Sequence, residues 1–407
     1  MAWSGLLLVA IGAVAGAPAI LVVGLLLAVV GALRGAWAQR GLVAMTYERR
    51  LSTRLATWGD EITLRLTVRN RKLLPVAWLR VDDYVSEDAM IRERPLIRTD
   101  RPGLAVLRNT WTLGPYERVE RTLHVVADRR GQFTFGPVRF QVADLLAAES
   151  SSEDRALPDR YLVVPRSVPM SGDASRMVEL RHHAVTHGAT EDPALYAGLR
   201  PYEHGDPMKR VHWRAAARTG TLRSKRYDPS RDRDAVIALD IQTVPGPHWL
   251  MAYDEDLAES LCVVALSVAR DMLGAGGACG LAAPAYWGSR STRIAIRPAT
   301  GPAQLRRLAE ALARVSTFAS APFESTLTDL PQWLPRPTSV VVITARDPGD
   351  YLPLLRRLTG LGFGVRTLGI GPSAAGGLGR LRRSGIEARQ VQLRPDWRTC
   401  GAVELAG

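Results

Sequence analysis

Cysteine is scarce in this chain, with three residues among 407, at positions 262, 279 and 400. The count is odd and no CxxC pair occurs, which argues against a disulfide framework and against a zinc site. Cys262 lies in an apolar stretch with helical spacing, so we interpret it as a core residue.

Lysine is equally rare, because Lys72, Lys209 and Lys225 are the only ones, and arginine carries most of the net charge of +13. The arginines are spread along the chain. No aromatic residues alternate with them, as the binding of a single strand would require. We therefore predict no nucleic-acid partner.

Charged side chains are missing from the N-terminus, where Arg34 is the first. Leu6–Leu33 is almost entirely Leu, Val, Ala, Ile and Gly. A run this long and apolar is typical of a segment that crosses a bilayer. We expect residues 1–45 to form a membrane anchor, with the lipid bilayer as a partner.

The form of this anchor stays open between two topologies. Gly16-Ala17-Pro18 is a turn signal, so the run is either one kinked helix or a hairpin of two short helices. A cleaved signal peptide is a third alternative, but no basic residue precedes the apolar run. Arginines follow the run, from Arg34 to Arg54, and such residues favour the cytoplasmic side. We expect localisation at the cell membrane with the bulk of the chain facing the cytoplasm.

Residues 46–165 have the period-two pattern of half-buried strands. Ile62, Leu64, Leu66 and Val68 alternate with polar residues, and turn residues separate several further short apolar runs. Short strands of this kind predict a β-sandwich. No catalytic constellation occurs in this region.

Residues 234–407 alternate between buried strands and amphipathic helices. Ala235–Leu239 is an apolar run typical of a strand buried on both faces, and 254–273 has helical spacing. The alternation predicts an α/β domain whose mostly parallel sheet is covered by helices on both faces. Ligands of such sheets gather at the carboxyl ends of the strands, where Asp240 and Asp347 lie.

Between the two domains, residues 166–233 form a predicted linker whose densest segment is Leu199–Tyr227. Asp206 and Pro207 suit the start of a helix over 208–217, which would place several arginines side by side. The candidate interaction residues are Arg200, Tyr202, Gly205, Asp206, Arg210, His212, Trp213, Arg214, Arg218 and Lys225. Such a helix would either bind an acidic partner or pin the two domains together.

This segment resembles the signature of the bacterial family called domain of unknown function 58. Pro201 and Ala216 depart from that signature, while Arg130–Pro137 matches a second part of it. The resemblance implies a multi-domain α and β fold: transmembrane segments, an immunoglobulin-like β-sandwich and a von Willebrand factor A-like (Rossmann-like) domain. It also implies a MoxR-type AAA+ ATPase as partner.

Domains of the von Willebrand class often bind Mg²⁺ through Asp-x-Ser-x-Ser after the first strand. Here Asp240 is followed by Gln242 and Val244 at the serine positions, with Thr243 out of register and Asp347 as a distant carboxylate. We expect no metal and no other cofactor, with Mg²⁺ at these residues as the alternative. A second metal alternative is the polar stretch from Glu179 to Asp192, which contains three histidines.

The sequence contains no P-loop, nucleophile elbow or zinc signature. We therefore predict a non-enzymatic adaptor that binds the ATPase or its client through the signature segment and the von Willebrand-like domain. Two alternatives stay open. One is an extracytoplasmic binding or adhesion module. The other is an enzyme, which would depend on a metal or use His212, with Asp206 nearby, as acid or base. The client, the pathway and the oligomeric state are not encoded in any motif.

Overall fold

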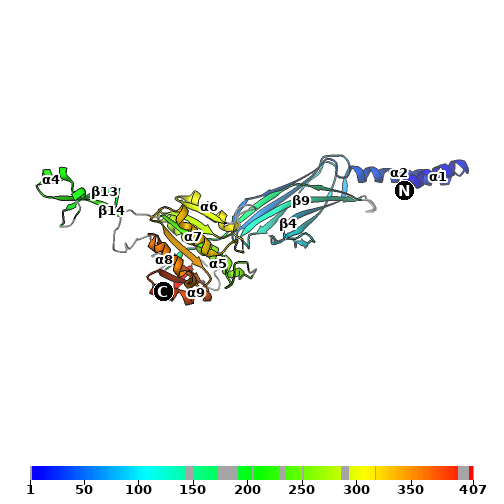
Figure 1. Cartoon of the computed structure of the whole chain (residues 1–407). Helices are drawn as coiled ribbons and strands as arrows, with labels where there is room; N and C mark the ends of the chain where they lie inside the picture. Colours follow the sequence, from blue (N-terminus) through cyan, green and yellow to red (C-terminus); the bar gives the residue numbers. More distant parts are fainter. Residues whose placement is uncertain are drawn as a thin grey trace. The chain divides into compact units, whose positions relative to one another are not determined.

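The chain divides into two compact units, Met1–Val164 and Pro165–Gly407. Its structure is a computed structural model (Figure 1). The residues that it describes are 2–143, 150–171, 191–203, 206, 208–229, 234–249, 252–285, 293–316, 318–392 and 403–406.

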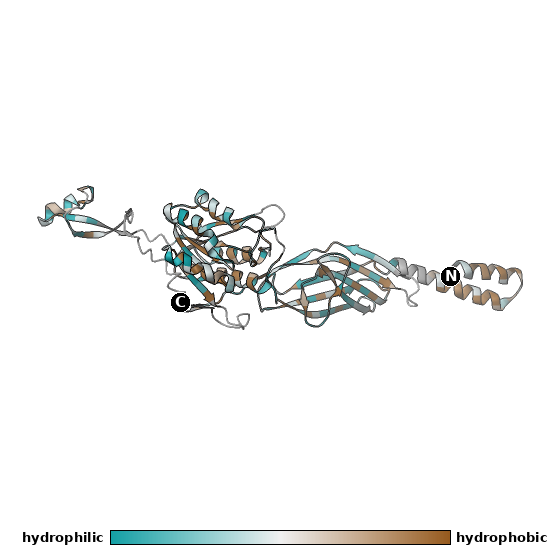
Figure 2. Cartoon of the chain, turned by 60° about the horizontal axis from the view of Figure 1, so that its bottom comes forward, coloured by the Kyte–Doolittle hydropathy of each residue, from teal (hydrophilic) through white to brown (hydrophobic). Residues whose placement is uncertain are grey.

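The N-terminal apolar run forms two helices, α1 (Ala2–Val14) and α2 (Pro18–Arg40). Gly16 at φ +65° makes the turn, and Pro18 begins α2, where its missing N–H costs nothing. The helices pack very closely, since a Cβ added at Gly5 would lie 2.3 Å from the Ala28 backbone nitrogen. Most large side chains of the pair are exposed, and Figure 2 shows its apolar colouring.

Within the described residues, no helix is both long enough and apolar enough to cross a membrane. The predicted N-terminal transmembrane segments are therefore wrong. The physical reason is the break at Gly16, which leaves α1 with 13 residues, or about 20 Å at 1.5 Å per residue. In α2 the uncharged part ends at Leu33, before Arg34 and Arg40. The bilayer partner and the membrane localisation were inferred from this segment and stay predictions.

Two sheets follow in the first unit, and their strands pair antiparallel except for β2 and β11, which are parallel. The smaller has the order β1-β3-β8-β5 and the larger β2-β11-β9-β4-β7-β6, with β10 paired to β9. The strands are β1 (Met45–Leu51), β2 (Leu55–Thr57), β3 (Glu61–Asn70), β4 (Val76–Ser86), β5 (Met90–Ile91), β6 (Ile97–Arg98), β7 (Leu104–Leu113), β8 (Arg118–Val126), β9 (Gly131–Ala143), β10 (Ser150–Arg155) and β11 (Asp159–Val164).

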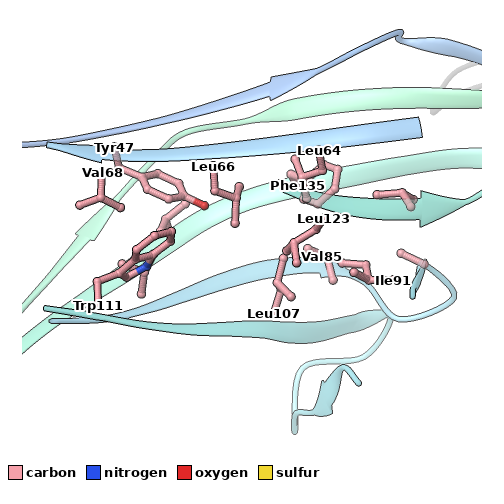
Figure 3. Packing of buried hydrophobic residues seen from close by; sticks show 14 of the residues in the cluster. Tyr47, Leu64, Leu66, Val68, Val85, Ile91, Leu107, Trp111, Leu123 and Phe135 are labelled. Atoms are coloured by element: carbon pink, nitrogen blue, oxygen red, sulfur yellow. The ribbon is translucent and has the colours of Figure 1, made fainter. Parts of the chain in front are cut away.

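One hydrophobic core lies between these two sheets (Figure 3). In β3, every second residue from Ile62 to Val68 is buried, as the alternation in the sequence predicts. Trp111 and Phe135 come from the larger sheet and fill the same core. The two inner faces thus hold the unit together through apolar burial.

The second unit contains a sheet with the order β12-β21-β20-β19-β18-β15-β16-β17. Its central strands from β20 to β16 are parallel, while β17 and β21 pair antiparallel at the sides. The strands are β12 (Met170–Ser171), β15 (Asp234–Leu239), β16 (Ala278–Ala283), β17 (Ile294–Ala299), β18 (Ser339–Thr344), β19 (Gly364–Ile370), β20 (Glu387–Gln392) and β21 (Val403–Ala406).

Helices cover this sheet because its strands are apolar toward both faces. They are α5 (Glu255–Gly274), α6 (Pro302–Arg314), α7 (Phe323–Trp333), α8 (Leu352–Gly360) and α9 (Pro372–Arg383), with a short 3₁₀ turn η2 (Pro348–Tyr351) (Figure 1). Side chains of α7, α8 and α9 share one core cluster with Val236, Val340 and Val342. Helices α5 and α6 contact each other, with α5 also against β15 and β16 and α6 against β16 and β17.

Candidate functional site

The predicted linker contains a two-stranded sheet of its own, formed by β13 (Glu191–Pro201) and β14 (Arg223–Pro229). The strands pair antiparallel, with Arg200 opposite Ser224 and Leu199 opposite Lys225. Between them lie a 3₁₀ turn, η1 (Met208–Arg210), and a short helix, α4 (Trp213–Thr219). We call residues 191–229 the signature hairpin.

A polar cluster around Asp206 fixes the base of the connection between the two strands. The Asp206 carboxylate accepts hydrogen bonds from Arg200, from Ser224 Oγ at 2.7 Å and from the Glu203 backbone N–H at 3.2 Å. These bonds, that of Ser224 foremost, lower the pKa of the Asp206 carboxyl. The cluster joins two predicted site residues, and Ser224 is a third member that the sequence analysis missed.

The predicted helix over 208–217 is wrong in its start, and so is its expected cap at Asp206. Helix α4 begins at Trp213, and its cap is His212, whose Nδ1 accepts a hydrogen bond from the Ala215 N–H at 3.1 Å. Asp206 cannot cap a helix here because its oxygens are already bonded within the polar cluster. The backbone N–H of His212 also donates to Arg223 O at 2.8 Å, which ties the start of α4 to β14.

Large apolar side chains of the signature hairpin lie in solvent. Trp213 is 58% exposed, Met208 is 55% exposed and Leu222 is 45% exposed. Arg214 and Arg218 are exposed on α4, and within the described part of the chain neither has an ion-pair partner. Exposed tryptophan, methionine and arginine together are typical of the energetic centre of a protein interface.

The remaining predicted site residues are Tyr202, Lys225, Gly205 and Arg210. Tyr202 is half-buried, and its hydroxyl lies 3.5 Å from Asp206 O. Lys225 is half-buried in β14. Gly205 lies outside the described residues, and for Arg210 the structure describes only its backbone place in η1.

A second cluster surrounds Asp240, at the carboxyl edge of β15 and its neighbour β18. Asp240 has no exposed surface. Its Oδ2 atom accepts three hydrogen bonds, from Thr344 Oγ1 at 2.9 Å, Tyr351 OH at 2.8 Å and Arg346 Nε at 3.0 Å. Its Oδ1 atom accepts from the Gln242 N–H at 3.2 Å. The carboxylate was predicted from the sequence, but the arginine was not.

The three candidate metal ligands are not brought together. Thr243 Oγ1 accepts from the Asp254 N–H at 2.8 Å, and the Asp347 carboxylate bonds the Gly349 N–H and Arg380. No group of three His, Cys, Asp or Glu suitable for a metal occurs among the described residues. The residues at Asp240 therefore do not fit Mg²⁺, because a cationic side chain already faces the carboxylate. The alternative ligands from Glu179 to His187 lie outside the described residues.

A third charged cluster lies in the β-sandwich, a region in which no candidate site residue was predicted from the sequence. Asp83 on β4 has no exposed surface. Its carboxylate accepts a hydrogen bond from Tyr47 OH at 2.9 Å and forms an ion pair with Arg49. Arg49 also donates to Leu157 O and lies over the Phe135 ring at 5.2 Å. Because β1 and β4 belong to different sheets, this cluster links the two layers of the sandwich.

Comparisons with known proteins leave the family open. No protein-family model matches this chain. A curated relative, the uncharacterized protein YeaD of Bacillus subtilis, is 23% identical over 231 residues, which cover 55% of this chain and 52% of the relative. The match thus spans about half the length of that relative.

Solved structures give weaker likenesses. A CARDB domain of the PF1109 protein from Pyrococcus furiosus is 16% identical, with a TM-score of 0.20, and the match covers 30% of this chain and 94% of that domain. A β-glucosidase from Listeria innocua is 12% identical, with a TM-score of 0.18, over 30% of this chain and 16% of the enzyme. Scores this low carry no argument about fold or activity.

Proposed function

We propose that this protein is a non-enzymatic adaptor that binds another protein through the signature hairpin. The observation that carries the proposal is the exposure of Trp213 on a short helix whose start is fixed by the His212 side-chain cap and by the hydrogen bond from the His212 N–H to Arg223 O. A large side chain on a pre-ordered backbone gains apolar burial on binding without a large loss of conformational freedom.

The charges around Trp213 define the chemistry of the partner. Arg214 and Arg218 are exposed on the same helix, Lys209 is exposed in the preceding turn η1, and no acidic residue lies on α4. A complementary partner therefore offers an apolar pocket with an acidic rim, which would bury the indole and pair with the arginines. The resemblance stated above supplies the expected class, a MoxR-type AAA+ ATPase or its client.

A catalytic role for His212 receives less support from its surroundings. Its Nδ1 atom caps α4, and the Asp206 carboxylate is bonded within the polar cluster. A general base needs a lone pair that can reach a substrate, and capping occupies one of the two ring nitrogens. The adaptor proposal requires no such group.

The test uses the full chain in cells, with a photo-crosslinking amino acid at position 213 and identification of the captured protein by mass spectrometry. We expect a AAA+ ATPase or its client as the principal product. Binding of the purified partner should weaken by about 30-fold or more in Trp213→Ala, because truncating a central aromatic typically costs at least about 2 kcal/mol.

Trp249→Ala is the matched control, since Trp249 is 72% exposed in the same unit but outside the signature hairpin. This variant should bind the partner as the wild type does. Equal loss in both variants, or equal retention in both, would contradict a docking site at Trp213. Capture of an unrelated protein would contradict the ATPase as partner while leaving the docking surface to be judged by the variants.

A further inference from the structure

The cluster at Asp240 contains the oxygen donors of a cation site but is closed by an arginine. The Asp240 carboxylate and the hydroxyls of Thr344 and Tyr351 converge within hydrogen-bond distance, and hard oxygens of this kind are what Mg²⁺ prefers. However, both hydroxyls donate hydrogen bonds to Asp240 Oδ2. The Nε–H of Arg346 donates to the same atom, which leaves it little lone-pair capacity for an ion.

The Arg346 guanidinium neutralises Asp240, but one of its own nitrogen donors has no hydrogen-bond partner among the described residues. The Arg346 side chain is 12% exposed, and its Nη2 atom is buried without a hydrogen-bond partner among the residues described. Burial by itself lowers the pKa of Arg346, but Asp240 and then Tyr351 outweigh it and raise the pKa above its usual value. A guanidinium with an unused donor is thus held in place chiefly by the carboxylate charge.

We propose that the guanidinium of Arg346 permanently takes the place of a divalent cation at the carboxyl edge of this sheet. The α/β domain then keeps Asp240 neutralised without metal, and its stability does not depend on Mg²⁺. The hydroxyls of Thr344 and Tyr351, which would complete the shell of an ion, instead orient the carboxylate toward the arginine. This inference is independent of the docking proposal, since it concerns a different element and a different measurement.

The first arm of the test follows thermal unfolding of the full-length wild type by calorimetry, in EDTA and in millimolar MgCl₂ or MnCl₂. We expect the unfolding temperatures to agree within about 1 °C, because a ligand that does not bind the folded state cannot stabilise it. A rise of about 5 °C or more that disappears in Asp240→Asn would overturn the proposal, since it would place a bound ion at this carboxylate.

The second arm removes the guanidinium in Arg346→Ser, which leaves the carboxylate and the hydroxyls facing a vacated volume. We expect this variant to unfold at a lower temperature in EDTA and to recover part of the loss in MnCl₂, with binding of Mn²⁺ detectable by titration calorimetry. Arg356→Ser removes an exposed arginine from the same domain and should show no response to the ion.

The proposal would also be overturned if Arg346→Ser folds but neither Mg²⁺ nor Mn²⁺ raises its unfolding temperature. The arginine would then be an ordinary ion-pair partner. If that variant fails to fold, Arg346→Lys keeps a positive charge and replaces it in the second arm. The lysine variant should stay insensitive to both ions, and an ion response in it would count against the proposal.

Discussion

Among the described residues, the β-sandwich and the α/β domain each contain one aspartate with no exposed surface at all, and each neutralises it with an arginine and a tyrosine. In the sandwich Asp83 meets Arg49 and Tyr47, and in the α/β domain Asp240 meets Arg346 and Tyr351. Both carboxylates have no exposed surface. The same three residue types thus solve the same electrostatic problem in two unrelated folds.

The two clusters differ in what supports the carboxylate besides the arginine. Asp83 has Tyr47 OH as its one further hydrogen-bond donor in the described part of the chain. Asp240 has three, from Thr344, Tyr351 and the Gln242 N–H. The difference follows from position, because Asp83 lies between two sheets, whereas Asp240 lies at a strand end where the Thr344 and Tyr351 hydroxyls and the Gln242 N–H converge.

The largest effect is expected from Arg49→Met, which leaves Asp83 buried with a single donor. We expect the free energy of unfolding of the sandwich to fall by about 4 kcal/mol at pH 7, as is typical when one partner of a buried ion pair is removed. Urea unfolding, monitored through hydrogen exchange of peptides from residues 45–164, would measure this fall in the free energy of unfolding. Arg50→Met, an exposed neighbour on β1, is the control and should change little.

The corresponding variant Arg346→Met should cost less, about 2 kcal/mol, because three donors continue to stabilise the Asp240 carboxylate. Hydrogen exchange of peptides from residues 234–392 would report it. If both arginine variants cost the same, the number of remaining donors would not explain the difference between the clusters.

Removing a tyrosine hydroxyl should cost less stability than removing the arginine of the same cluster. The cost should again be larger in the sandwich than in the α/β domain. Tyr47→Phe should lower the free energy of unfolding by about 2 kcal/mol and Tyr351→Phe by about 1 kcal/mol, since a hydrogen bond to a charged group is worth about 1.5–3 kcal/mol before other donors compensate. Tyr116→Phe, which is exposed, controls for the loss of a phenol group. A larger loss of stability in Tyr351→Phe than in Tyr47→Phe would contradict the idea that the additional donors at Asp240 compensate for a lost hydroxyl.

The smallest effect is a pH dependence of the sandwich. Burial raises the pKa of the Asp83 carboxyl above its ordinary value of 3.8, although Arg49 opposes the shift. A raised folded-state pKa gives stability that is complete below pH 3.8 and is lost as the pH rises through the folded value. Wild type should therefore lose stability relative to Asp83→Asn from about pH 4 upward, by at most about 1.4 kcal/mol per pH unit.

Urea unfolding at several pH values would measure this difference. Asp100→Asn, an exposed carboxylate in the same unit, controls for the general loss of a negative charge. A wild type that gains stability over Asp83→Asn as the pH rises would mean that Arg49 outweighs burial at Asp83.

The strands were the most predictable part of the chain, because their burial follows directly from residue order. The alternation from Ile62 to Val68 and the apolar run Ala235–Leu239 each predicted a strand that is present. The helix α7 was missed, since Pro331 lies within it and proline usually ends a helical pattern. The fold class was wrong at the N-terminus, where hydrophobic content was a poor guide to helix length.

The candidate site was only partly predictable. Trp213 and Asp206 were identified, but their roles depend on partners that are distant in sequence, such as Ser224. Arg346 lies 106 residues from Asp240, and only the parallel pairing of β15 with β18 brings them together. One signal was available: Thr344 ends an apolar strand and Arg346 follows it two residues later, at the edge where Asp240 was expected.

By itself, the sequence determined which segments are apolar, which alternate, and where glycine and proline interrupt them, because these properties act between near neighbours. Only the tertiary structure decided that Arg49 would face Asp83, that Arg346 would face Asp240 and that Trp213 would stay exposed. Those outcomes depend on strand order and on the sides of sheets, and pairing between distant strands is a property of the folded chain as a whole.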